Sequence, residues 1–167
     1  MAWIGDGDNV CNSWLYGAAL AGIDFAVATP QAYEPLASVV SDATTLARST
    51  GGRITLTEEP QTAANGADCV MTDTFVSMGE EAEKEKRERT FLPKYQVDSM
   101  LMSLAKRDAV FEHCLPAHRG EEVTADVIDS PQSVVFDQAE NRLHTTKAVL
   151  CFLTLGKKEL SSLVKSR

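Results

Sequence analysis

Short apolar runs alternate with longer amphipathic segments along this chain, and the alternation limits its fold more than any other feature. Strands that alternate with helices form βαβ units, in which helices cover both faces of a parallel sheet. We therefore expect an α/β protein, with a three-layer αβα fold around a parallel sheet of roughly four to five strands. The apolar runs that could supply these strands are Trp3–Gly5, Phe25–Ala28, Arg53–Thr57, Cys69–Thr72, Ala109–His113 and Ser133–Phe136.

Helix signals fill the gaps between these runs. Apolar residues recur there at helical spacing, and Gly22 and Gly51 stand where helices should end. We expect helices at about residues 10–21, 33–49, 60–65, 94–104 and 139–155. No internal repeat or linker interrupts the pattern, so residues 1–167 are expected to form a single domain.

A charged run lies within the long excursion from Asp73 to Pro93. It contains three pairs in which Glu precedes a basic residue by four positions, an arrangement that stabilises solvated helices. These pairs are Glu80–Lys84, Glu83–Arg87 and Glu85–Arg89. The pattern predicts an exposed helix, and so long an excursion at a strand end is also a candidate lid.

Charge and composition exclude several classes of partner. The chain has 16 basic and 24 acidic residues, a net charge of −8, whereas nucleic acids and anionic membranes require a basic surface. The longest apolar run, Ala148–Leu155, is too short to cross a bilayer. The four cysteines, Cys11, Cys69, Cys114 and Cys151, lack CxxC spacing, which argues against a disulfide framework and indicates a reducing, cytosolic compartment.

Polar clusters follow four of the expected strands. In a parallel sheet these strand ends share one edge, outside which ligands bind. The clusters are Gly5–Asn9, Asp73–Gly79, His113–Pro116 and Asp137–Arg142. The third cluster places an imidazole and a thiol at this edge, and its meaning depends on whether the other clusters converge on it.

Each cluster has a structural and a functional interpretation. Gly5–Asn9 matches a dinucleotide fingerprint in part, but the third glycine falls at Val10. Asn9 could cap a helix or hold a carboxylate. Asp73 could close a turn or bind an ammonium group. A cation in the first helical turn is unfavourable, so Arg142, expected there, should have an anionic partner.

Cys114 is either a buried structural thiol or a reactive group whose pKa is lowered by the adjacent His113. A cysteine-protease site would need a separate histidine and an orienting Asn or Asp, which the sequence does not place. Zinc binding through His113, Cys114 and His118 matches no standard spacing. We therefore expect no metal.

Four motifs in combination resemble ornithine carbamoyltransferase, in that family's order and at its approximate spacing. They are Gly5–Val10, Asp73 with Ser77-Met78-Gly79, His113–Pro116 and Phe136–Arg142. The resemblance implies a Rossmann-like fold of the aspartate/ornithine carbamoyltransferase type. It also implies transfer of the carbamoyl group of carbamoyl phosphate to the δ-amine of L-ornithine, giving citrulline and phosphate, in arginine biosynthesis or the urea cycle. No cofactor is implied.

The resemblance assigns an ornithine pocket to particular residues. Asn9 would hold the region of the α-carboxylate, and Asp73 would pair with the α-ammonium. Ser77 and Met78 would complete the pocket from a mobile loop. Cys114 would lie beside the δ-amine and help to orient and deprotonate it.

The resemblance likewise implies contacts with carbamoyl phosphate. His113, Arg142 and the backbone of Cys114 and Leu115 would supply them. The catalytic residues would then be Cys114, His113 and Asp73.

The sequence departs from the family in two respects. Asp8 stands where many members have Asn, which adds negative charge beside the proposed carboxylate contact. The Ser-x-Arg-Thr and His-Pro-x-Gln strings of the family's N-terminal domain do not occur. We therefore expect residues 1–167 to be the ornithine-binding domain alone, without the N-terminal carbamoyl-phosphate-binding domain, and to be inactive alone. The family is homotrimeric, and the state of this chain is left open.

Other functions stay open at this point. A non-catalytic amino-acid-binding module would use the same pocket, and putrescine or acetylornithine could replace ornithine as the acceptor. A dinucleotide-binding oxidoreductase domain is disfavoured by Val10 and by the other three motifs.

Overall fold

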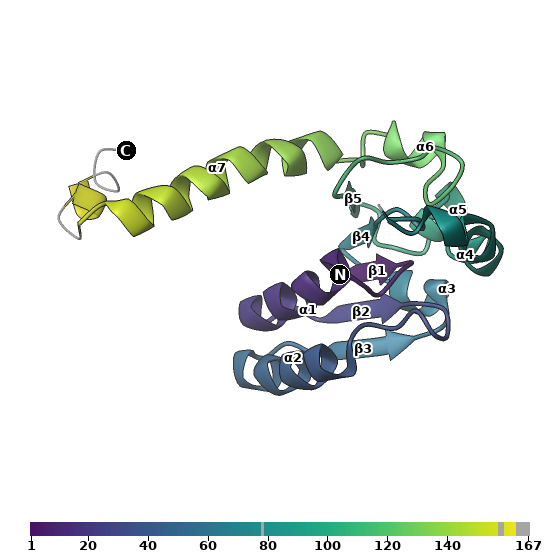
Figure 1. The fold of residues 1–167 in the computed structure, drawn as a ribbon, viewed down its shortest axis with the longest axis horizontal. Coiled ribbons are helices and arrows are strands. Elements are labelled where there is room, and N and C mark those ends of the chain that lie inside the picture. Colours follow the sequence, from purple (N-terminus) through teal and green to yellow (C-terminus); the bar gives the residue numbers. More distant parts are fainter. Residues whose placement is uncertain (78, 157–158, 163–167) are drawn as a thin grey trace. The chain divides into compact units, whose positions relative to one another are not determined.

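Five parallel strands form the central sheet in the order β3-β2-β1-β4-β5 (Figure 1). The computed structural model describes residues 1–77, 79–156 and 159–162, in two compact units of which the first ends at Val135 and the second begins at Phe136. The strands, all in the first unit, are β1 (Ala2–Ile4), β2 (Phe25–Ala28), β3 (Ile54–Thr57), β4 (Cys69–Thr72) and β5 (Val110–His113). The predicted parallel α/β fold is confirmed.

Two apolar cores separate the sheet from its helices, because successive strand residues point to opposite faces. On one face, Trp3 and Met71 pack against α1 (Val10–Ala21) and α2 (Ala37–Thr50). On the other face, Ile4 and Val70 belong to the core that includes the helices α3 (Pro60–Ala64), α5 (Ser99–Met102) and α6 (Ala125–Ile128). The three expected layers are therefore present.

Two helices are shorter than expected, for local reasons. Helix α2 begins at Ala37 and not at residue 33, because Pro35 disfavours helical backbone at the residue before it. Helix α5 covers Ser99–Met102 and not residues 94–104. Val97 instead forms a parallel bridge with Val123, and the Asp98 side chain caps α5 by accepting the Leu101 N–H at 2.8 Å.

The expected strand at Ser133–Phe136 was wrong. Ser133 makes an isolated bridge with Phe111, and the Val134 N–H donates to the Phe111 carbonyl at 3.0 Å. Helix α7 (Val135–Thr154) then begins at once. The segment therefore touches β5 for two residues and continues as a helix.

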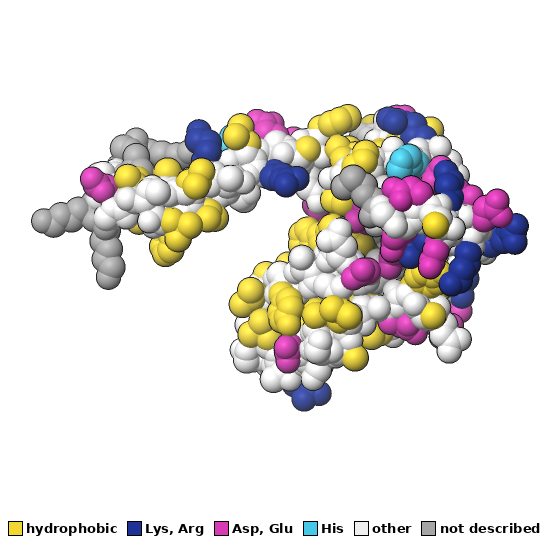
Figure 2. Space-filling model, viewed as in Figure 1, with side chains coloured by type: hydrophobic (Ala, Val, Ile, Leu, Met, Phe, Trp, Pro, Cys, Tyr) yellow, Lys and Arg dark blue, Asp and Glu magenta, His cyan; other side chains and the backbone are white. Residues whose placement is uncertain are grey.

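The excursion after β4 contains a short 3₁₀ turn, η1 (Glu81–Glu83), and helix α4 (Lys84–Phe91). Of the three expected charge pairs, Glu85–Arg89 forms at 3.4 Å. The other two were wrong, because Lys84 pairs with Glu88 and Glu121 and Arg87 pairs with Asp6 and Glu80. Acidic and basic side chains are interspersed over this region, whereas apolar side chains gather over α1 (Figure 2).

Arg87 anchors this excursion to the sheet and is 5% exposed, not solvated as expected. Its guanidinium pairs with the carboxylate of Asp6 after β1, and its Nε donates to the Phe75 carbonyl at 2.5 Å. The guanidinium carbon lies 4.9 Å from the centre of the Tyr33 ring. A buried charge with a carboxylate, a carbonyl and an aromatic ring around it is compensated on several sides.

The second unit consists of most of helix α7 and the residues after it. Its exposed surface carries a pair between His144 and Glu140, with Nε2 and Oε1 separated by 3.4 Å. Among the described residues, no helix combines the length and the apolar character that crossing a bilayer requires.

The buried pair predicts an asymmetry in stability. Asp6→Asn should lower the free energy of unfolding by about 3 kcal/mol, because Arg87 then keeps its charge in a buried position without its closest partner. Urea unfolding followed by circular dichroism measures this. The matched control is Asp24→Asn, which breaks an exposed pair with Arg53 (74% and 63% side-chain exposure) and should cost about 1 kcal/mol or less. Equal losses in the two variants would contradict the anchoring role.

Candidate active site

The carboxyl ends of β1 and β4 lie side by side at the centre of the sheet. The chain runs from β1 to β2 and β3 on one side and returns to β4 and β5 on the other, so the strand order reverses between β1 and β4. Such a reversal opens a crevice where α/β proteins bind ligands. The turn Gly5–Asn9 follows β1 and Asp73 follows β4, so these two predicted strand-end clusters meet here.

The turn after β1 is held close to the neighbouring loop. A Cβ at Gly7 would lie 2.4 Å from the Pro35 nitrogen, so a side chain does not fit there. Asn9 has φ 44°, a left-handed conformation that Asn tolerates better than most residues. Asn9 stands at the N-cap position of α1, as predicted, but its side chain makes no capping hydrogen bond to the helix. The exposed amide instead lines the crevice.

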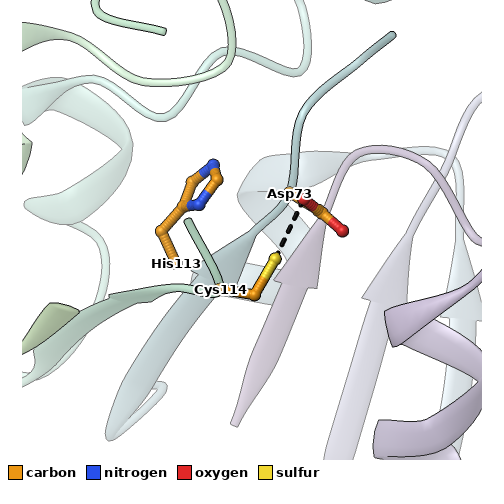
Figure 3. A group of neighbouring side chains, drawn as sticks. All are labelled: Asp73, His113 and Cys114. Atoms are coloured by element: carbon orange, nitrogen blue, oxygen red, sulfur yellow. Dashed lines mark hydrogen bonds between the residues drawn. The ribbon is translucent and has the colours of Figure 1, made fainter. Parts of the chain in front are cut away.

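Asp73 and Cys114 form a direct side-chain hydrogen bond across the ends of β4 and β5 (Figure 3). The Cys114 Sγ donates to Asp73 Oδ1 at 3.0 Å, and the same oxygen accepts the Thr74 N–H at 2.7 Å. The sheet register pairs Thr72 with His113, which leaves the next residue of each strand opposite the other. Two predicted site residues from distant parts of the sequence therefore meet.

The environment of Cys114 favours the neutral thiol. Partial burial, the hydrogen bond to Asp73 and the charge of that carboxylate together raise the pKa of Cys114 to about 12. This direction is opposite to the lowering expected from the adjacent imidazole. At neutral pH the sulfur is thus a hydrogen-bonding dipole, with its proton directed at Asp73.

The His113 ring is buried and has its own partners, away from the thiol. Nδ1 accepts the Leu115 N–H at 2.9 Å, so the ring proton belongs on Nε2, which lies 3.2 Å from Glu122 Oε1. Glu122 is fully buried, and its Oε1 also accepts the His118 N–H at 2.5 Å. Sequence reasoning missed Glu122, because a carboxylate in a polar loop has no spacing signal that reveals its burial.

Leu115 turns the loop so that its N–H faces this ring. Its φ of 57° is rare for a bulky side chain, since the left-handed region crowds the Cβ. The hydrogen bond from Leu115 to His113 is made in this conformation. The backbone after Cys114 is therefore held in place by the buried histidine.

The crevice contains a pocket of about 250 Å³. Its lining residues are Asp6, Asp8, Asn9, Asp73, Thr74, Ser77 and Glu80. The structure thus brings Asn9, Asp73 and Ser77 together as predicted, while Met78 lies outside the described residues. Glu80 fixes the Ser77 backbone, because its Oε2 accepts the Ser77 N–H at 3.0 Å while its Oε1 lies 3.1 Å from an Arg87 nitrogen.

Arg142 does not follow a strand, contrary to expectation. It lies in the second unit on α7, about two turns beyond the helix start at Val135. The argument that a first-turn cation needs an anionic partner was therefore wrong for Arg142. A role in binding an anion stays a prediction.

The pocket suits a small cationic ligand better than a nucleotide. Arg87 offsets the charges of Asp6 and Glu80, while Asp73 and Asp8 leave the lining negative. Asp73 could hold an ammonium group, and the neutral Cys114 thiol lies against it. The zinc set of His113, Cys114 and His118 is not among the three-donor groups of the described residues, in which Asp73 joins His113 and Cys114 instead.

Comparison with known proteins now decides the family. Residues 1–153 match the family model described as "Aspartate/ornithine carbamoyltransferase, Asp/Orn binding domain". The chain belongs to this family. The ornithine carbamoyltransferase of Halalkalibacterium halodurans is 54% identical over 156 residues, which are 93% of this chain and 49% of that protein.

Solved structures agree with this membership. Ornithine carbamoyltransferase from Pyrococcus furiosus superimposes with a TM-score of 0.85 at 51% identity, over 90% of this chain and 48% of that one. The anabolic ornithine carbamoyltransferase from Campylobacter jejuni gives 0.86 at 42% identity, over 91% and 50%. The chain spans about half the length of the relatives it matches. The family resemblance found in the sequence is confirmed.

The raised pKa predicts slow alkylation of Cys114 despite its exposure. Its rate with iodoacetamide should increase steadily between about pH 7 and 9, because the thiolate is scarce throughout this range. Asp73→Asn removes a negative charge and a proton acceptor and should accelerate the reaction about tenfold. Mass spectrometry of the Cys114 peptide measures the alkylation rate at each pH in the unmodified chain and in Asp73→Asn, with Asp24→Asn as the control. A fast, pH-independent rate would show a thiolate and contradict this environment.

The hydrogen bond that His113 Nδ1 accepts predicts which tautomer the neutral ring adopts. Nitrogen-15 NMR should show the proton on Nε2 and an unprotonated Nδ1, because Nδ1 accepts the Leu115 N–H. The exposed His144 on α7 provides an internal reference. A proton on Nδ1 of neutral His113 is the result that this geometry does not allow.

Proposed function

We propose that this chain is the L-ornithine-binding domain of an ornithine carbamoyltransferase and that it acts with a carbamoyl-phosphate-binding domain. Together they would transfer the carbamoyl group to the δ-amine of L-ornithine, giving citrulline and phosphate. The observation that carries the proposal is the hydrogen bond between Cys114 and Asp73 at 3.0 Å, beside an acidic pocket at the centre of the sheet edge.

In this proposal the pocket orients ornithine through its α-ammonium and α-carboxylate groups. Asp73 pairs with the α-ammonium, and Asn9 contacts the region of the α-carboxylate. Ser77 closes the pocket from the excursion that Arg87 anchors. The pocket is small enough to order a single amino acid, and ordering the nucleophile supplies part of the catalysis.

The lone pair of the neutral δ-amine would attack the carbonyl carbon while the carbon–oxygen bond to phosphate breaks, and the departing phosphate would accept the proton that the new amide nitrogen loses. The Cys114 thiol is neutral at neutral pH. Its sulfur would accept a hydrogen bond from the δ-amine while its S–H donates a hydrogen bond to Asp73. It would therefore orient the lone pair rather than act as a thiolate base. No metal or organic cofactor is required for this step.

Carbamoyl phosphate would bind beside the δ-amine of ornithine, near the loop that follows β5. We assign its contacts here to the backbone of Cys114 and Leu115 and to His113. Glu122 would act through His113 by fixing its tautomer and orientation. The backbone after Cys114 is held by the buried ring, which would preorganise it for this contact.

The location and assembly of the protein follow as proposals. The four cysteines are free thiols, which fits a cytoplasmic protein. We expect a homotrimer whose contacts are made mainly by the carbamoyl-phosphate-binding domain.

Binding to the 167-residue chain tests the pocket directly. Calorimetry should detect weak binding of L-ornithine, and Asp73→Asn should weaken it by about tenfold or more, because an ammonium loses its carboxylate. Putrescine and N-acetylornithine are the competing ligands, and each lacks a backbone group that the pocket would hold. Asp24→Asn is the control. Tighter binding of putrescine, or no effect of Asp73→Asn, would reject ornithine as the substrate of this pocket.

Catalysis needs a separate experiment. Citrulline should form when the chain is combined with a carbamoyl-phosphate-binding domain of a relative, and Cys114→Ser should reduce the rate while leaving ornithine binding nearly unchanged. Ornithine binding without any citrulline from the combination would favour the non-catalytic binding module.

A further inference from the structure

Three metal-ligating side chains converge on the loop after β5, outside the pocket described above. They are His118, Glu121 and Glu122, each of which offers one ligand atom within 4.8 Å of the others. We propose that this loop binds a divalent transition-metal ion of the zinc class through these three side chains. The proposal does not depend on the proposed function.

The separation of two of the ligand atoms already fits a bound ion. His118 Nδ1 and Glu122 Oε2 are 3.6 Å apart. Two ligands at about 2.1 Å from a tetrahedral zinc ion are separated by roughly 3.4 Å, so an ion between them requires little movement. The Glu121 carboxylate has rotatable bonds with which to complete the set.

A buried oxygen without a donor points independently to a ligand. Glu122 is 0% exposed, and its Oε1 is engaged by the His118 N–H and by His113. Within the described part of the chain, no donor reaches Oε2 at hydrogen-bond distance. His118 Nδ1, at 3.6 Å from Oε2, is too far for a hydrogen bond but is placed to share an ion.

The loop is rigid enough to hold a site in shape. The Gly120 N–H donates to the Val123 carbonyl at 2.8 Å, and the Val97 N–H donates to the Glu122 carbonyl at 2.9 Å. The Gln96 amide donates to the carbonyls of Gly120 and Glu121 at 2.9 and 2.8 Å. The loop backbone is thus held before any ion arrives, which reduces the ordering that binding requires.

The neighbouring cations leave room for the ion. Arg119 is engaged by Asp129 through two hydrogen bonds of 2.9 and 2.6 Å. Lys84 Nζ lies 3.7 Å from Glu121 Oε1 but also 3.3 Å from Glu88, with which it can stay paired when Glu121 turns to the metal. Glu121 is therefore the ligand that has to change partner.

The donor set selects the kind of metal. One imidazole nitrogen and two carboxylate oxygens suit Zn²⁺ and Co²⁺, whereas Ca²⁺ and Mg²⁺ prefer oxygen ligands alone. The site also touches the active site, since the same Glu122 carboxylate lies against His113. An ion here would therefore tighten the support of the loop that carries Cys114.

Cobalt provides the test, because its visible spectrum reports the ligands. The 167-residue chain and Cys114→Ser should both show the absorption of four- or five-coordinate Co²⁺ and bind it with similar affinity. His118→Ala, at a half-exposed side chain, and Glu121→Gln should each weaken binding by about tenfold or more. Zn²⁺ should displace Co²⁺ in competition.

Two outcomes would overturn the proposal. If Cys114→Ser abolishes binding and His118→Ala retains it, the ion lies at the group formed by Asp73, His113 and Cys114 instead. In that case the unmodified chain and His118→Ala would show a sulfur-to-cobalt charge-transfer band. If the unmodified chain shows no cobalt spectrum at neutral pH, the loop is not a metal site.

Discussion

The parallel pairing of β4 with β5 is the constraint on which the rest of the site depends. Its register sets Thr72 opposite His113, so the first residue after each strand, Asp73 and Cys114, can share a hydrogen bond. The residues that precede these two, Thr72 and His113, are buried polar side chains. The same register thus separates the reactive edge from the buried support, and one slipped residue would exchange the two.

Two buried side-chain contacts support the site from different sides. Arg87 joins the excursion after β4 to the turn after β1 through Asp6, and through Glu80 it reaches the backbone of Ser77. Glu122 joins the loop after β5 to the ring of His113. Each pair holds a segment that carries residues of the proposed site. Burial makes such contacts costly to break, which suits positioning roles.

The alternation of apolar runs predicted the fold class, the first five strands and helix α1 well, because strand and helix periodicities are local. Burial by distant partners was not predictable: Arg87 was expected in solvent and is enclosed by Tyr33 and Phe75, and Glu122 was not singled out at all. Ser133–Phe136 has strand propensity but meets β5 for two residues before α7 begins. The positions of strand ends and the family resemblance predicted four site residues, Asn9, Asp73, Ser77 and Cys114. That the Cys114 thiol is neutral could be inferred only from its hydrogen bond to Asp73 and its partial burial.

The central claim is that L-ornithine binds with its α-ammonium group at Asp73 and its δ-amine beside Cys114. The most direct test is an isotope-filtered NMR experiment on the 167-residue chain, with labelled protein and unlabelled L-ornithine. The account predicts nuclear Overhauser effects from the ornithine δ-methylene protons to the Cys114 β-protons and from the α-proton to Asp73. Contacts confined to residues elsewhere in the chain, with none at Cys114, would contradict it.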